Sequence, residues 1–163
     1  MSEAVDVAIL MGSKGDWAVM KHAAETLREL AIRSESRVLS AHRTPAETAQ
    51  YVQQAETQGV RVFIAAAGMA AHLSGAVAAH TVRPVLGVPL AASELNGLDA
   101  LLATVQMPPG IPVGTLAIGK AGAINAALLA AAILAVDRPA LREALLARRR
   151  QKAAEILAER LDG

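Results

Sequence analysis

Cysteine is absent from the 163 residues of the sequence. Its absence excludes a disulfide scaffold, a Cys-based zinc site and a cysteine nucleophile. The formal net charge is only +1, which provides no electrostatic driving force for binding nucleic acid or a membrane surface. No apolar run reaches the roughly 20 residues of a membrane-spanning helix, and the acidic start of the sequence does not resemble a signal peptide. These absences predict a soluble, cytoplasmic protein.

Aromatic side chains are also scarce, because the chain has one Phe, one Trp and one Tyr. By contrast, 37 residues are Ala. Small apolar side chains pack closely but each removes little surface from water, at a gain of about 25 cal/mol per Å². A chain of this length is expected to form a single domain. We therefore expect it to gain additional burial at a subunit interface, with the almost wholly apolar helix 122–136 partly buried there.

Short apolar runs alternate with helical patterns along the whole chain. The expected strands are residues 5–11, 34–39, 60–66, 84–88 and 113–118, and the main helices are residues 16–31, 45–59, 98–105, 122–136 and 139–161. Such alternation is typical of an α/β fold with a parallel sheet, in which ligands bind at the carboxyl ends of the strands. Polar and Gly-rich residues gather at these ends, in residues 12–16, 40–44, 66–75, 89–94 and 119–122.

Three local signals refine these boundaries. Asp16 is expected to cap the first helix through its carboxylate. Thr44, Pro45 and Glu47 have the spacing of a capping box with Pro at the first helical position. Pro89 is expected to end the fourth strand, because proline cannot donate a ladder hydrogen bond.

Residues 12–16, Gly-Ser-Lys-Gly-Asp, follow a strand and open a helix. Such a turn can bind phosphate through backbone N–H groups and the Ser13 hydroxyl, or it can be an ordinary strand–helix turn. Residues 114–121 match most of a P-loop but lack its final Ser or Thr and lie largely within a strand. We interpret that second match as a false positive.

The sequence Ser40-Ala41-His42-Arg43 is the most informative segment. A His at a strand end can exchange protons near neutral pH, and the adjacent Arg can pair with a phosphate or carboxylate. The alternative is a capping turn with an exposed Arg. His72 precedes another helix, where it could donate to an anion or act only as a cap.

The remaining polar candidates form no recognisable site. His22 and His80 fall on expected helices with no polar cluster around them, and both are interpreted as structural or surface residues. The basic run 148–150 alternates with Glu residues as a solvated helix face does. Glu94 and Asp99 form no acid/base pair, and no His spacing suggests a metal site.

Several of these segments together resemble one family, the 5-(carboxyamino)imidazole ribonucleotide mutases of de novo purine biosynthesis. The resemblance covers residues 5–134, nearly the whole chain. Its most specific signatures are Ser-Ala-His-Arg-Thr-Pro and Gln-Met-Pro-x-Gly-x-Pro-Val. The matching segments are residues 11–17, 40–45, 67–73, 87–89, 105–113 and 117–123.

This resemblance implies a three-layer flavodoxin-like α/β domain with a five-stranded parallel sheet, assembled into a homo-octamer. The domain would span residues 1–163, with a core at about 5–136 and a C-terminal helix at about 139–161. The implied reaction moves a carboxylate from the exocyclic nitrogen of an imidazole nucleotide to the adjacent ring carbon. It releases CO₂ from the carbamate inside a closed site and recaptures it there, with no metal, nucleotide or biotin cofactor.

The family match also implies roles for individual residues. His42 would shuttle the proton. Ser13, Asp16, Ser40 and Arg43 would hold the nucleotide, with Asp16 on the ribose hydroxyls and Arg43 on the phosphate. The carboxylate end of the site would be lined by Gly68, His72 and Leu73.

The chain departs from the family pattern at three positions. Gly15 stands where the family has a second Ser, and Ser74 stands where it has a Pro. Met69 replaces a Gly, the residue type that tolerates a positive φ, which is strained for Met. Two alternatives therefore remain open: a direct carboxylase that takes aminoimidazole ribonucleotide and CO₂, and a catalytically weak relative that binds a nucleotide for regulation.

Overall fold

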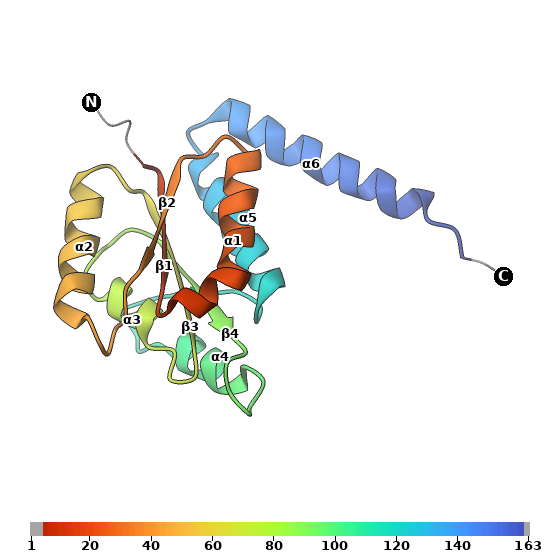
Figure 1. Ribbon diagram of the computed structural model, residues 1–163. Coiled ribbons are helices and arrows are strands. Elements are labelled where there is room, and N and C mark those ends of the chain that lie inside the picture. The colour runs from red at the N-terminus through yellow and green to blue at the C-terminus, as the bar shows by residue number, and fades with distance from the viewer. Residues whose placement is uncertain (1–4, 162–163) are drawn as a thin grey trace.

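The computed structural model describes residues 5–161, so residues 1–4 and 162–163 of the expected domain lie outside it. Five parallel strands form one sheet in the order β2-β1-β3-β4-β5 (Figure 1). This arrangement confirms the expected α/β class. The strands are β1 (Val7–Met11), β2 (Ser34–Val38), β3 (Val62–Gly68), β4 (Val85–Leu90) and β5 (Gly114–Thr115). The helices are α1 (Trp17–Glu29), α2 (Pro45–Thr57), α3 (Leu73–Ala78), α4 (Leu98–Val105), α5 (Lys120–Leu134) and α6 (Pro139–Ala158), with a 3₁₀ turn η1 (Lys14–Asp16).

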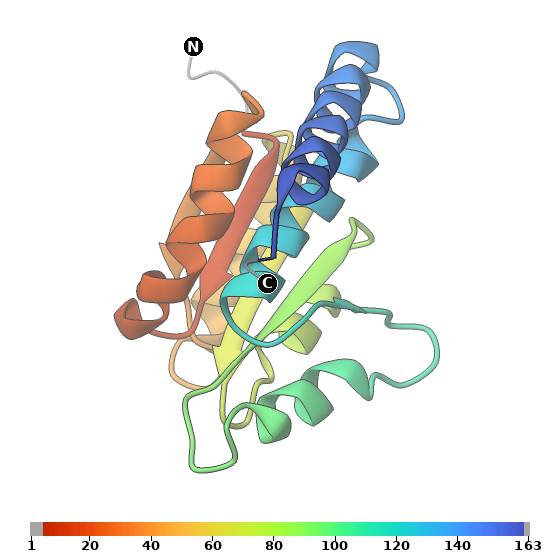
Figure 2. The same ribbon diagram turned by 90° about the vertical axis from the view of Figure 1, so that its right-hand side faces the viewer.

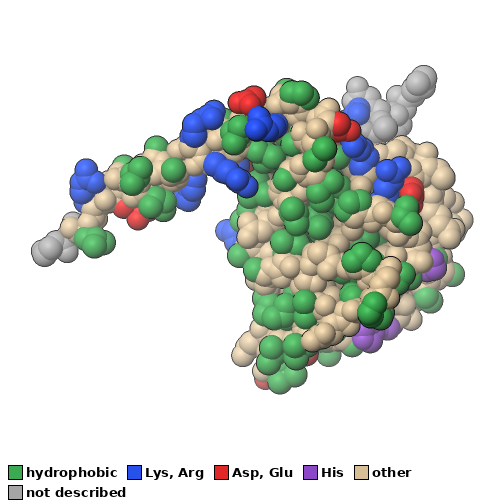
Figure 3. All heavy atoms as spheres, turned by 180° about the vertical axis from the view of Figure 1, so that it is seen from behind, with side chains coloured by type: hydrophobic (Ala, Val, Ile, Leu, Met, Phe, Trp, Pro, Cys, Tyr) green, Lys and Arg blue, Asp and Glu red, His purple; other side chains and the backbone are tan. Residues whose placement is uncertain are grey.

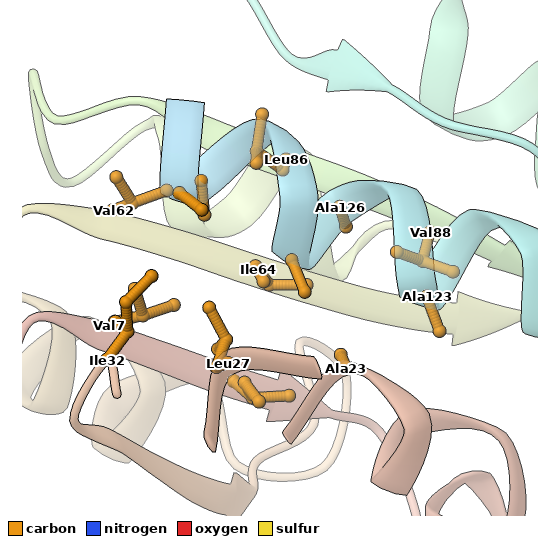
Figure 4. Packing of buried hydrophobic residues seen from close by; sticks show 14 of the residues in the cluster. Val7, Ala23, Leu27, Ile32, Val62, Ile64, Leu86, Val88, Ala123 and Ala126 are labelled. Carbon is orange, nitrogen blue, oxygen red and sulfur yellow. The ribbon is translucent and has the colours of Figure 1, made fainter. Parts of the chain in front are cut away.

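Helices α1 and α5 cover one face of the sheet and pack against each other (Figure 2). The core on this face joins strand residues such as Ile64 and Val88 to Leu27 of α1 and to Ala123 and Ala126 of α5 (Figure 4). The side of α5 that faces the sheet is almost entirely Ala. Because alanine methyl groups are short, this helix lies close to the strands and to α1 without large side chains between them.

Helices α2 and α3 cover the opposite face, around Phe63 and Leu10 of the sheet. Helix α4 lies on the same face, because Thr104 and Ser74 approach the backbone of Gly87 in β4. An ideal Cβ at Gly87 would lie 2.4 Å from the Thr104 side chain. The molecule therefore has the three-layer arrangement that the family resemblance implied.

Strand β4 continues through Pro89 to Leu90, so the expected break at Pro89 is wrong. The carbonyl of Pro89 faces the β5 side, where it accepts the Gly119 N–H at 2.9 Å. The regular pairing of β5 ends at Thr115, opposite Gly87. Proline's missing N–H therefore lies beyond the paired part of β5, where the ladder requires no donor.

Strand β5 is only two residues long, shorter than the expected span 113–118. Leu116 and Gly119 still donate to the β4 carbonyls of Gly87 and Pro89. The chain advances three residues from Leu116 to Gly119, whereas β4 advances only two from Gly87 to Pro89. This mismatch resembles a β-bulge, and the regular pairing of β5 with β4 ends there.

Helix α6 projects from the body of the molecule (Figure 1). Leu141 is its only buried residue, and Arg148 pairs with Glu29 of α1 at 2.7 Å. The basic run 148–150 is exposed, as expected for a solvated face. Within residues 5–161, no helix is both long and apolar enough to cross a membrane.

Candidate active site

A pocket of about 470 Å³ lies at the carboxyl edge of the sheet. Met11 pairs with both Val38 and Ala66, so β1, β2 and β3 reach this edge in register. The loops that follow these three strands form most of the pocket wall, and Ala92 after β4 completes it. The site therefore lies where the parallel fold places ligands.

All eight residues that the sequence singled out line this one pocket. They are Ser13, Asp16, Ser40, His42, Arg43, Gly68, His72 and Leu73. Residues 119–122 do not line the pocket, and neither does Glu94. Ala92 was not singled out, although it falls within the strand-end segment 89–94 that the sequence marked.

The first loop is held by a hydrogen bond from the Ser13 N–H to Asp16 Oδ2, at 2.8 Å. Asp16 makes no side-chain cap bond to α1, so its expected capping role is wrong. The 3₁₀ turn η1 precedes α1, and the carboxylate folds back to the start of that turn instead. Asp16 lines the pocket from this loop, and its second carboxylate oxygen is not used by the Ser13 hydrogen bond.

The second loop is closed by Thr44. Its hydroxyl accepts the Ser40 N–H at 2.8 Å and donates to the Ser40 carbonyl at 3.1 Å. Thr44 occupies the N-cap position of α2 but makes no side-chain cap bond, so the expected capping box does not form. The hydroxyl instead fixes a tight turn that presents His42 and Arg43.

Arg43 joins the first two loops. Its Nη2 donates to the Gly12 carbonyl at 2.7 Å, and its Nε donates to Ser40 Oγ at 3.3 Å. Ser40 is buried, whereas Arg43 is exposed. The guanidinium has five N–H donors in a planar fork, so these two bonds orient it and leave donors for an anion.

His42 and His72 meet across the pocket. His42 Nε2 lies 2.7 Å from His72 Nδ1, and the two ring planes are nearly perpendicular at 81°. At this distance the two nitrogens share one proton, with one ring as donor and the other as acceptor. His72 occupies the N-cap position of α3 but makes no side-chain cap bond. Its Nδ1 contacts His42 instead.

The third loop contains a strained residue. Met69 has a φ of +56°, the left-handed region that the family's Gly would adopt without strain. That conformation costs a side-chain-bearing residue about 1–2 kcal/mol. The preceding Gly68 is required here, since an ideal Cβ would lie 2.4 Å from the Cβ of Ala92.

The other two departures from the family pattern have milder surroundings. A Cβ at Gly15 would meet only Ser13 Oγ at 3.6 Å, an ordinary contact, so the space for a side chain is present. Ser74 is buried in the first turn of α3. Neither Gly15 nor Ser74 lines the pocket.

The remaining histidines lie apart from the pocket, as expected. His22 Nδ1 pairs with Glu25 at 3.0 Å on α1, and His80 is exposed after α3. No cluster of three or more His, Cys, Asp or Glu side chains that could hold a metal occurs among residues 5–161.

Comparison with known proteins agrees with this geometry. The family model described as AIR carboxylase matches residues 6–155. The N5-carboxyaminoimidazole ribonucleotide mutase of Brucella melitensis is 55% identical over 156 residues, covering 96% of each chain. The enzyme of the same name from Escherichia coli K12 is 54% identical, covering 93% of this chain and 89% of its own. The crystal structure of Treponema denticola PurE matches with a TM-score of 0.85 at 26% identity, covering 93% of each chain.

The family match spans the whole sheet and every loop of the pocket, and relatives above 50% identity cover nearly the full chain. The chain therefore belongs to the AIR carboxylase family.

Proposed function

We propose that the protein is an N5-carboxyaminoimidazole ribonucleotide mutase, an isomerase of de novo purine biosynthesis. The observation that carries this proposal is the pocket that combines His42, in contact with His72, with the cationic Arg43 and the Ser13 turn. Relatives with that name are 54% and 55% identical to this chain over the aligned residues. The reaction moves a carboxylate from the exocyclic nitrogen of the imidazole nucleotide to its ring carbon.

The first two loops bind the phosphorylated ribose. Arg43 supplies the positive charge for the phosphate, and the Ser13 hydroxyl and the N–H groups of η1 supply further donors. Asp16, held by the Ser13 N–H, accepts hydrogen bonds from the ribose hydroxyls. Ser40 holds the Arg43 side chain at Nε and thereby fixes the phosphate position.

His42 carries the proton through both halves of the reaction. As the bond between the exocyclic nitrogen and the carboxylate breaks, CO₂ leaves and the nitrogen takes a proton from His42. As the ring carbon then bonds to the same CO₂, its hydrogen leaves as a proton and returns to His42. One proton is donated and one is recovered, so no co-reactant is needed.

The third loop surrounds the carboxylate end. Gly68 and Leu73 leave a small apolar space there, and His72 holds the imidazole of His42 in one orientation. A dry compartment favours recapture, because CO₂ that meets the solvent is lost.

The proposal is tested by giving the purified protein two substrates in separate assays. The carbamate nucleotide alone is expected to be converted to the ring-carboxylated product faster than its spontaneous decay. Turnover only with the uncarboxylated nucleotide and excess bicarbonate would instead identify a direct carboxylase. Tight nucleotide binding without turnover in either assay would identify a non-catalytic binding protein.

The proton-shuttle role predicts that His42→Asn still binds the nucleotide but loses catalysis. We expect kcat to fall by about 10²–10⁴-fold, the usual contribution of a general acid–base group. His80→Asn is the matched control, because His80 is exposed and lies outside the pocket, and its kcat is expected to be unchanged. Wild-type turnover by His42→Asn would remove His42 from this role.

The phosphate contact predicts that Arg43→Ala weakens nucleotide binding. A charged hydrogen bond is worth about 1.5–3 kcal/mol, so Kd is expected to rise by about 10- to 100-fold. Titration calorimetry with the product nucleotide measures the change. Arg142→Ala, an exposed residue of α6, should leave Kd unaltered. Equal Kd values for the wild type and Arg43→Ala would contradict the contact.

We also propose that the chain works as a cytoplasmic homo-octamer built from this single domain. Its substrate is a charged nucleotide, which partitions poorly into a bilayer. Leu157 near the end of α6 is 79% exposed, and Val136, which precedes the start of α6, is 89% exposed. Figure 3 shows hydrophobic side chains over the face next to the projecting helix, with Lys and Arg along that helix. An assembly would bury these apolar groups.

The assembly proposal predicts a particle of eight chains by light scattering coupled to size exclusion. Leu157→Glu and Val136→Glu together are expected to reduce the mass, because each places a charge where an apolar contact is needed. A wild-type protein that stays monomeric at micromolar concentration would contradict the assembly.

A further inference from the structure

Met69 combines a strained backbone with an exposed side chain at the pocket. Its φ is +56° and its side chain is 59% exposed. Ala31 has a similar φ of +54° and is also exposed, but it lies outside this pocket. Burial in the protein core therefore does not offset the strain at Met69. Met69 instead lines the pocket.

The surrounding backbone holds Met69 in this conformation. Gly68 lies close to Ala92 and to the Leu90 carbonyl, where an added Cβ would lie 2.4 Å from the Ala92 Cβ. Ala71 on the other side is buried and donates its N–H to the Met69 carbonyl at 2.9 Å. A backbone fixed on both sides sets the direction in which the side chain leaves the loop.

The chemistry of a methionine suits a movable wall. The thioether chain has three rotatable bonds and an apolar, polarisable end, so it adapts to the shape of whatever it covers. Much of the Met69 surface is exposed. A planar imidazole ring bound beside His42 would offer the surface on which this side chain becomes buried.

We propose that the Met69 side chain closes over the bound imidazole and keeps the released CO₂ in the pocket until the ring carbon captures it. This inference rests on the proposed mutase function. Met69 takes no part in bond making: the bond from nitrogen to carboxylate breaks, the carbon–carbon bond forms, and His42 gives and recovers the proton. Its contribution is to lower the escape of CO₂ between these two steps.

Isotope retention in the product measures that escape directly. Unlabelled carbamate nucleotide is converted in ¹³C-bicarbonate buffer with carbonic anhydrase, which keeps the labelled CO₂ pool in equilibrium. Initial product is analysed by mass spectrometry, and enzyme-free exchange is subtracted. Wild-type product is expected to keep mostly its own unlabelled carboxylate. In Met69→Gly the labelled fraction is expected to rise at least about twofold, or substrate to be lost as the uncarboxylated nucleotide.

Two further variants distinguish the loss of the Met69 side chain from the relief of its backbone strain. Ala31→Gly relieves a similar strain away from the pocket and is expected to retain the carboxylate as the wild type does. Met69→Leu keeps an apolar side chain and is expected to stay near the wild-type value. The inference would be overturned if Met69→Gly gave the labelled fraction of wild type with no extra uncarboxylated nucleotide, or if it consumed no substrate.

Failure of the proposed function gives a different result. A wild-type protein that makes no product from the carbamate nucleotide would overturn both proposals. A wild-type product labelled to the level of the bicarbonate pool would show that there is no retention for Met69 to provide. Wild-type retention with an unchanged Met69→Gly would overturn only the role of Met69.

Discussion

Parallel pairing of β1 with β2 on one side and β3 on the other brings the pocket loops together. Because Met11 lies opposite both Val38 and Ala66, the three strands end at the same edge. The loops that follow then start side by side, although they are separated by many residues in the sequence. Arg43 reaches the Gly12 carbonyl and His42 reaches His72 only because of this register. A shift of one residue in either pairing would move the loops apart by about 3.3 Å.

The alanine-rich composition acts at two levels. Inside the chain, Ala123 and Ala126 let α5 lie against the sheet with little side-chain volume between them. The same composition leaves the chain with few large buried groups and with apolar side chains exposed on α4 and α6. The scarcity of aromatic side chains and the exposed apolar side chains of α4 and α6 both favour additional burial at a subunit interface.

Much of the fold and site could be predicted from sequence, but the structure differs from three local predictions. Asp16 and Thr44 have the right residue types for helix caps, yet their oxygens bond to the Ser13 and Ser40 backbones instead. Sequence alone does not show which of several nearby N–H groups a short polar side chain will choose. Pro89 predicts a strand break from its missing N–H alone, because the sequence does not show which strand lies beside it. Its missing donor is tolerated only because the regular pairing of β5 ends at Thr115.

The sequence by itself determined the alternation of strands and helices, the eight candidate residues and the family to which they point. These depend on local periodicity and on motifs that are contiguous in the chain. Only the tertiary structure decided that His42 Nε2 lies 2.7 Å from His72 Nδ1, although the two residues are thirty positions apart in the sequence. It also decided that Ala92 lies against Gly68 and that Met69 adopts a left-handed φ beside the pocket. Such contacts depend on strand order and register, which are set by the packing of the whole sheet.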